Sequence, residues 1–165
     1  MILIAVGSNL SVPGLGTPAE ICAKALARLD SMGIRIIATS RFYETAPVPV
    51  SDQPWFVNAV AAVATGLDAG GLLAALHQVE QEFGRVRRER NEARVLDLDL
   101  IDYEGMVDDG SPILPHPRAV ERAFVLLPLR DVAPGWRHPR DGRALEDLIA
   151  SLPPGQAARP MSGLD

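Results

Sequence analysis

The chain has very few of the residues on which several common kinds of active site depend. It holds one cysteine, Cys22, among 165 residues, so an internal disulfide is impossible and we expect a protein of the reducing cytoplasm. Its one lysine, Lys24, does not lie in a Gly-x-x-x-x-Gly-Lys motif, which excludes a P-loop. The three scattered histidines, His77, His116 and His138, give no spacing typical of a zinc site.

Aromatic residues, excess positive charge and long apolar runs are scarce as well. Eight aromatic residues and a formal net charge of −5 argue against a general nucleic-acid-binding protein. No run of about 18 apolar residues occurs, so we expect no membrane span, and the first residues predict a strand rather than a signal peptide. The length and the 47% hydrophobic content predict one globular domain over residues 1–152, followed by a loosely held tail over 153–165.

The most informative segment is Leu96–Leu100, in which leucine and aspartate alternate. In a strand, Asp97 and Asp99 share one face about 7 Å apart, where two carboxylates repel each other unless a cation lies over them. Residues 85–94 hold five arginines and have a local charge of +3: Arg85, Arg87, Arg88, Arg90 and Arg94. Because carboxylates suit Mg²⁺ and arginines suit phosphate, the two features together predict chemistry on a nucleotide.

Each of these two features also has a structural interpretation. Alternating leucine and aspartate is typical of a half-buried strand with one solvated face, and an arginine run is typical of an exposed loop. The concentration of five of the sixteen basic residues within ten positions favours the phosphate-binding interpretation.

The hydrophobic spacing predicts a βαββαβ order, which is that of the ferredoxin-like α+β fold, an antiparallel sheet with helices packed on it. The expected elements are a strand over 2–6, a helix after the capping box Thr17–Glu20, strands over 34–43 and 55–65, a helix from Asp68 to Gly84 and a strand over 94–102. A C-terminal helical extension is expected as a helix over 118–132, interrupted near Pro128, and a helix over 144–152.

Phe56 and Asn58 lie two residues apart on an expected strand and therefore share a face. An aromatic ring beside an amide can hold a flat heterocycle, since the ring stacks and the amide offers donors and an acceptor. A core phenylalanine with an asparagine that caps a bulge is an equal alternative. His116, between two prolines, is by itself more typical of a structural histidine.

Several short motifs recur in one order along the chain. They are Ala5–Leu10, Phe42–Pro47, Gln53–Asn58, Gly84–Arg87, Arg94–Leu100, Pro115–His116 and Arg122–Phe124. From residue 2 to about residue 150 this order and spacing resemble the 6-hydroxymethyl-7,8-dihydropterin pyrophosphokinase family, for which Arg-x-Leu-Asp-Leu-Asp-Leu is close to diagnostic. The resemblance implies a ferredoxin-like core and transfer of the β,γ-diphosphate of ATP to the pterin hydroxymethyl group, with release of AMP, in folate biosynthesis.

The resemblance also assigns roles by position. Asp97 and Asp99 match the catalytic pair that holds two Mg²⁺ ions, and Arg85 and Arg94 match catalytic arginines that act on the phosphates. The pterin-binding positions are Thr45, Ala46, Val48, Phe56, Asn58 and Phe124, and the ATP-binding positions are Glu80, Arg87, Leu100, His116 and Arg122. The expected partners are therefore ATP and the pterin, with no nucleic acid or membrane, and we expect a monomer.

The chain departs from the family pattern at three places. Asn91 stands where the family often has tryptophan, in a loop one residue shorter; Phe56 stands where tyrosine is frequent; and Pro117 follows the histidine where an aromatic residue can occur.

Two other functions fit part of the pattern. A non-catalytic ferredoxin-like nucleotide- or RNA-binding module would need a basic, aromatic-rich sheet face, and a simple kinase would transfer only the γ-phosphate.

Overall fold

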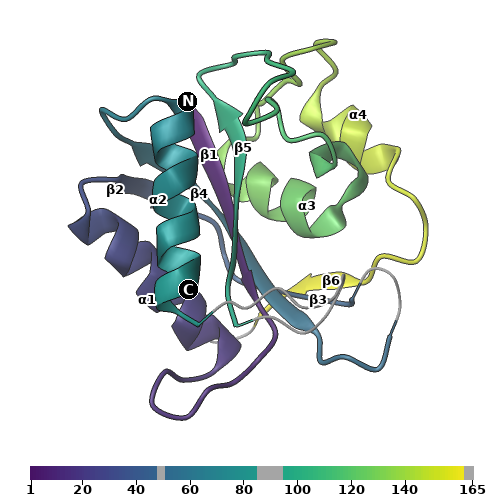
Figure 1. Cartoon of the computed structure of the whole chain (residues 1–165). Coiled ribbons are helices and arrows are strands. Elements are labelled where there is room, and N and C mark those ends of the chain that lie inside the picture. The colour runs from purple at the N-terminus through teal and green to yellow at the C-terminus, as the bar shows by residue number, and fades with distance from the viewer. Residues whose placement is uncertain (48–50, 85–94, 162–165) are drawn as a thin grey trace.

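The computed structural model describes residues 1–47, 51–84 and 95–161 (Figure 1). The elements are β1 (Ile2–Ser8), α1 (Pro18–Ser31), β2 (Arg35–Thr39), β3 (Tyr43–Thr45), β4 (Phe56–Ala64), α2 (Ala69–Glu82), β5 (Asp97–Tyr103), the 3₁₀ turn η1 (Ala119–Glu121), α3 (Ala123–Val132), α4 (Leu145–Ala150) and β6 (Ala158–Pro160). The sheet order is β5-β1-β4-β3-β6, with β2 also on β4, and the strand pairs are antiparallel. The predicted α+β ferredoxin-like core with C-terminal helices is confirmed. Within the described residues, no helix is long and apolar enough to cross a membrane.

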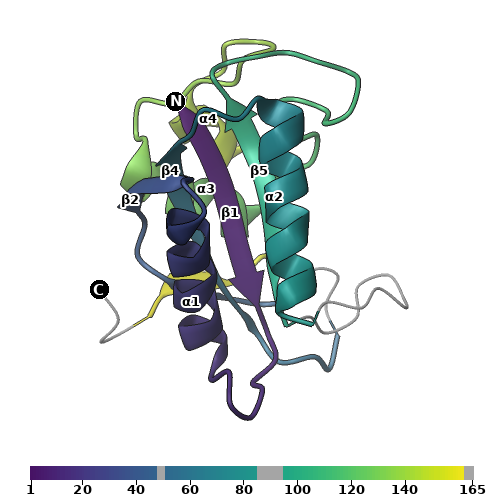
Figure 2. The same cartoon turned by 60° about the vertical axis from the view of Figure 1, so that its left-hand side comes forward.

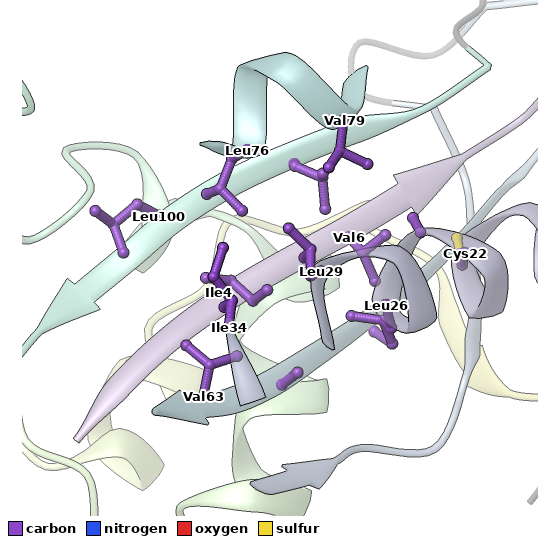
Figure 3. Close-up of a cluster of buried hydrophobic side chains, with 14 of the residues drawn as sticks. Ile4, Val6, Cys22, Leu26, Leu29, Ile34, Val63, Leu76, Val79 and Leu100 are labelled. Carbon is purple, nitrogen blue, oxygen red and sulfur yellow. The ribbon is translucent and has the colours of Figure 1, made fainter. Parts of the chain in front are cut away.

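The sheet lies between two helical layers, with α1 and α2 on one face and α3 and α4 on the other (Figures 1 and 2). Alternate residues of β1 enter the two cores. Ile4 and Val6 pack with Leu29 and Leu76 beneath α1 and α2 (Figure 3), whereas Leu3 packs with α3 and α4. Burial on both faces explains why residues 2–6 of β1 are all apolar.

The two long helices begin where their capping residues predict. The Thr17 hydroxyl accepts the Glu20 N–H at 3.3 Å while the Glu20 carboxylate accepts the Thr17 N–H at 3.1 Å, which forms the expected capping box. Asp68 accepts the Gly71 N–H at 2.7 Å at the start of α2. Gly84 follows α2 with a φ of 85°, a conformation that glycine adopts without strain.

The strand expected over 34–43 is wrong as a single element, because the chain forms two strands, β2 and β3, that both pair with β4. Between them the Ser40 hydroxyl accepts the N–H of Val60 at 3.0 Å, so a side chain takes the place of a ladder carbonyl. The next strand, β5, begins at Asp97, two residues after the described chain resumes at residue 95.

The interruption of the helix over 118–132 lies at Arg122 and not near Pro128. Arg122 is extended, with φ −120° and ψ 111°, and separates η1 from α3. Pro128 lies inside α3, which continues through it because Leu126 and Leu129 on either side are fully buried against the sheet. Tertiary burial here outweighs the lost helical hydrogen bond.

Part of the segment expected as a loose tail is an ordered strand. Residues Ala158–Pro160 form β6, which pairs antiparallel with β3. Backbone bonds extend this pairing at both ends, from Ala46 N to Ala157 O at 2.9 Å and from Met161 N to Phe42 O at 2.8 Å. Because β3 otherwise leaves an unpaired edge, a short extended segment gains a full set of ladder bonds there.

A partly exposed polar cluster joins β3 to α3. The Tyr43 hydroxyl and the Arg41 guanidinium both donate to the Asp131 carboxylate at 3.0–3.1 Å. Burial by itself raises the pKa of Asp131, but the hydrogen bonds from Arg41 and Tyr43 outweigh it and lower the pKa below its ordinary value.

We expect Asp131→Asn to lower the free energy of unfolding by about 1–3 kcal/mol near neutral pH, because two donors lose a charged acceptor. A carboxyl with a lowered folded pKa contributes stability above its unfolded pKa of 3.8, and this contribution is lost as the pH falls through the folded value. The difference between the two proteins should therefore shrink in acid, as measured by urea unfolding at pH 7 and pH 3. Tyr43→Phe, which removes one donor only, should cost less. A difference that is the same at both pH values would contradict this account.

Candidate active site

The candidate site lies on the face of the sheet that carries α3. Gly7 is the cross-strand partner of Asp97 on one side and of Asn58 on the other. Directly opposed residues of an antiparallel sheet share a face, so a carboxylate, a glycine and an amide form one row across three strands. Because the glycine has no side chain, the Asn58 amide oxygen can lie directly over it.

Asn58 is buried, with 6% of its surface exposed, and its amide is fixed in place. Its Nδ2 donates to Thr45 Oγ1 at 2.5 Å, and a Cβ on Gly7 would lie only 2.5 Å from its Oδ1. Asn58 pairs regularly with Gly7 and Tyr43, and the register shifts near it fall at Leu3/Ile4 and Ile36/Ala38, so the bulge-capping alternative is wrong. Phe56, two residues earlier on the same face, is partly exposed and belongs to neither core cluster. Phe56 is therefore available to a ligand on this face, and the buried Asn58 amide lies beside it.

Asp97 and Asp99 are half-buried on the site face, and the intervening Leu98 is buried on the opposite face, as the alternation predicts. Asp99 lies opposite Ala5, so the carboxylate next along the strand also has only a small neighbour. The backbone of this edge strand is held by Glu80 of α2, which accepts the Leu98 N–H at 2.8 Å. Glu80 is 4% exposed and so fixes the strand that carries both aspartates.

His116 approaches the aspartates from the loop before α3. Its Nε2 lies 3.9 Å from Asp99 Oδ1, and its backbone N–H donates to Ile101 O of β5. Burial, followed by the positive charge of Arg122, lowers the pKa of His116 to about 4, against the opposing effect of Asp97. Its Nδ1 accepts the Arg118 N–H at 3.2 Å. The neutral ring therefore carries its proton on Nε2, where it can donate to an anion near the carboxylates.

Arg122 and Phe124 stand at the start of α3, where the Arg122 guanidinium lies 5.2 Å from the centre of the Phe124 ring. Phe124 is partly buried against the core beneath α3 and α4. Leu100 differs from the other expected site residues, because its side chain is 4% exposed and packs beneath α1 and α2. A contact between Leu100 and a ligand on the site side would therefore have to come through its backbone.

Some expected site residues lie outside the described residues: Val48, Arg85, Arg87 and Arg94, together with Asn91. Ala46 is described, and its N–H is bonded to Ala157 O. Gly7 and Asn9, which have no role assigned from the sequence, also shape the site. Gly7 makes room for the Asn58 amide, and Asn9 anchors the loop before β4 by donating to Gln53 Oε1 and Pro54 O. The sequence signal for this role of Gly7 is a glycine within a largely apolar strand, which often marks a close approach of another group to the backbone.

The residues present fit magnesium. Among the described residues no group of three or more His, Cys, Asp or Glu could enclose a metal ion. Asp97 and Asp99 nevertheless offer two hard oxygen donors on one strand face. Mg²⁺ is commonly held by one or two carboxylates together with substrate phosphates, so two carboxylates are a sufficient protein contribution.

These features define a class of protein. It is a ferredoxin-like α+β domain whose carboxylate pair and histidine suit a magnesium-bound phosphate, and whose amide and aromatic side chains suit a flat ring. The model of the 7,8-dihydro-6-hydroxymethylpterin-pyrophosphokinase (HPPK) family matches residues 3–134. The chain belongs to this family.

Two bacterial relatives are similar over nearly their whole length. A 2-amino-4-hydroxy-6-hydroxymethyldihydropteridine pyrophosphokinase of Pseudomonas aeruginosa is 42% identical over 153 residues, which cover 92% of this chain and 91% of the relative. A protein of the same name from Methylorubrum extorquens is 39% identical over 158 residues, which cover 94% and 96%.

The chain spans only a part of some other relatives. It is 37% identical over 152 residues to the folic acid synthesis protein fol1 of Pneumocystis carinii, which covers 92% of this chain and 20% of that protein. A crystal structure of a triple mutant of Plasmodium falciparum HPPK-DHPS matches with a TM-score of 0.65 and 15% identity, over 90% of this chain and 43% of that one. At this identity the structural likeness supports the fold alone.

Proposed function

We propose that this protein transfers the β,γ-diphosphate of ATP to the hydroxymethyl oxygen of 6-hydroxymethyl-7,8-dihydropterin, in folate biosynthesis. A bond forms between that oxygen and the β-phosphorus, the bond from the β-phosphorus to the α,β-bridging oxygen breaks, and AMP leaves. Family membership supports the pyrophosphokinase activity. The observation that carries the assignment to this site is the row Asp97–Gly7–Asn58, which puts a carboxylate suited to metal-bound phosphate beside an amide suited to a ring edge.

The pterin is assigned to the Asn58 side of the row. With Nδ2 bonded to Thr45, the Asn58 Oδ1 is oriented to accept an N–H from the ring edge. Phe56 on β4 and Phe124 on α3 are the aromatic side chains that stack on the ring faces. The backbone of residues 45–48 is the further pterin contact that the family resemblance assigns.

The phosphates are assigned to the Asp97 side. Asp97 and Asp99 are the residues that would hold Mg²⁺, with two ions proposed, and bound Mg²⁺ would offset the negative charge of the triphosphate. The Nε2–H of His116 and the guanidinium of Arg122 can donate to phosphate oxygens from the α3 side. Arg85, Arg87 and Arg94 are assigned to the phosphates by resemblance, and Glu80 and Leu100 to the nucleotide. Because phosphoryl transfer needs little covalent chemistry from the protein, alignment and charge supply most of the catalysis.

We further propose that the protein works as a monomer in the cytoplasm, without nucleic acid or membrane partners. Elution from size-exclusion chromatography at the 17.7 kDa of one chain would support the monomer, and elution at twice that mass would contradict it.

The activity is tested by ³¹P NMR of the purified protein with ATP, Mg²⁺ and 6-hydroxymethyl-7,8-dihydropterin. We expect AMP and a pterin diphosphate, formed in equal amounts and only when all components are present. Omission of Mg²⁺ or addition of EDTA should stop the reaction. Formation of ADP with a pterin monophosphate would identify a simple kinase instead. Absence of any product, despite binding of both ligands, would favour the non-catalytic binding module.

A further inference from the structure

The C-terminal segment contacts the start of α3 through one side chain, Gln156. Its Oε1 accepts the Ala123 N–H at 2.9 Å, and its Nε2 donates to the Glu121 carbonyl at 2.7 Å. These two groups belong to the residues immediately before and after Arg122. A single amide therefore holds both sides of the residue at which the chain changes from η1 to α3.

This contact replaces a local helix cap. The first N–H groups of a helix need acceptors from outside the helix. At α3 the N-cap residue is Arg122, whose side chain makes no capping hydrogen bond. Gln156 supplies the acceptor from 33 positions away in the sequence. It thereby fixes the extended Arg122 backbone, and with it the direction in which Phe124 leaves the first turn of the helix.

The segment that carries Gln156 is itself anchored on the other side of the candidate pterin site. Ala157 O accepts the N–H of Ala46, and β6 then pairs with β3, whose Thr45 holds the Asn58 amide (Figure 1). Arg159 adds an ion pair to Glu44 at 2.9 Å and lies 5.1 Å from the centre of the Trp55 ring. The segment 156–161 therefore connects the strand that carries Thr45 to the helix that carries Phe124.

We propose that Gln156 is a positioning residue for the pterin: it holds the start of α3 so that Phe124 lies at the correct separation from Asn58 and Phe56. This inference rests on the proposed function, because it takes the flat ligand between these side chains to be the pterin. Gln156 does not touch the ring. It acts through Phe124, so its contribution to affinity should disappear when Phe124 no longer stacks.

The test is a double-mutant cycle between Gln156→Met and Phe124→Ala. Methionine keeps the length of glutamine and removes both hydrogen bonds. The dissociation constant of 6-hydroxymethyl-7,8-dihydropterin is measured by calorimetry with Mg²⁺ and α,β-methylene-ATP, which cannot release AMP. We expect Gln156→Met to weaken pterin binding roughly tenfold in the wild-type background, the scale of a lost helix cap, and less than about twofold in the Phe124→Ala background.

Gln78→Met is the matched control, because the same substitution there removes an amide hydrogen bond to the Glu82 carboxylate on the exposed face of α2. It should leave pterin affinity unchanged. Wild-type affinity in Gln156→Met, or an equal loss in both backgrounds, would overturn the inference, the latter because it would show an effect that does not pass through Phe124. Failure of the proposed function is separate: it would appear as absence of AMP and pterin diphosphate with the wild-type protein.

Discussion

Asp97→Asn is expected to lower turnover by at least about 100-fold, the largest effect among the described residues. The substitution keeps the size of the side chain and removes the negative charge of one member of the Asp97–Asp99 pair. An amide is a much weaker ligand for Mg²⁺ than a carboxylate, so the affinity for Mg·ATP should also fall. Formation of AMP at saturating pterin, measured over a series of Mg²⁺ concentrations, gives both quantities.

The matched control for this charge change is Glu104→Gln, just beyond the end of β5. Glu104 is exposed and pairs with the N-terminal amine, so its loss changes the net charge equally without touching the site. We expect wild-type turnover from it. Turnover of Asp97→Asn within a few-fold of wild type at every Mg²⁺ concentration would contradict the metal assignment, and the phosphate side of the site would have to be placed elsewhere.

Gly7→Ala is expected to raise the KM for the pterin by at least roughly tenfold while the protein stays folded. The added methyl group would lie 2.5 Å from Asn58 Oδ1, well inside van der Waals contact. Asn58 is buried and bonded to Thr45, so it cannot move aside without losing that bond. The amide that is assigned to the ring edge would therefore be displaced. Steady-state kinetics with each substrate varied in turn should show a much smaller change in the KM for ATP.

Gly135→Ala is the control for the glycine substitution, because a Cβ there meets no atom within 4 Å. It should leave both KM values unchanged. The mechanism is tested in the Asn58→Ala background, where the clash is absent and Gly7→Ala should add less than about a twofold further loss. A full additional loss in that background would mean that Gly7 acts by some route other than the Asn58 amide.

Sequence signals that lie within a few residues correctly predicted the helices and strands that carry them. The capping box at Thr17, the Asp68 cap and the glycine after each of the first two helices are contained within a few residues, and α1 and α2 form where these residues predict. The same applies to β1 and β4, whose apolar runs are buried on both faces. The predictions over 34–43 and 118–132 were wrong in detail, because each depends on a contact with a distant part of the chain. The Ser40 hydroxyl bonds Val60 of β4 between β2 and β3, and the Gln156 amide bonds the start of α3.

The candidate site likewise has one part that the local sequence predicts and another that depends on the fold. The alternation of Leu96–Leu100 is enough to put Asp97 and Asp99 on one face, since side chains in a strand alternate with a period of two. Nothing in the local sequence indicates that Gly7 stands between Asp97 and Asn58, because that row depends on the register of three strands. The role of Glu80 at Leu98 likewise requires α2 to lie beside β5.

The sequence by itself therefore determined the order of elements, the paired carboxylates, the concentration of arginines and the resemblance to a pyrophosphokinase. These depend on residue type and spacing along the chain, which are local quantities. Only the tertiary structure decided which side chains meet across strands, where α3 begins, and that β6 pairs with the edge of the sheet. Contacts such as Gln156 with Ala123 join residues far apart in sequence, and their geometry exists only once the core has fixed the register and the helices.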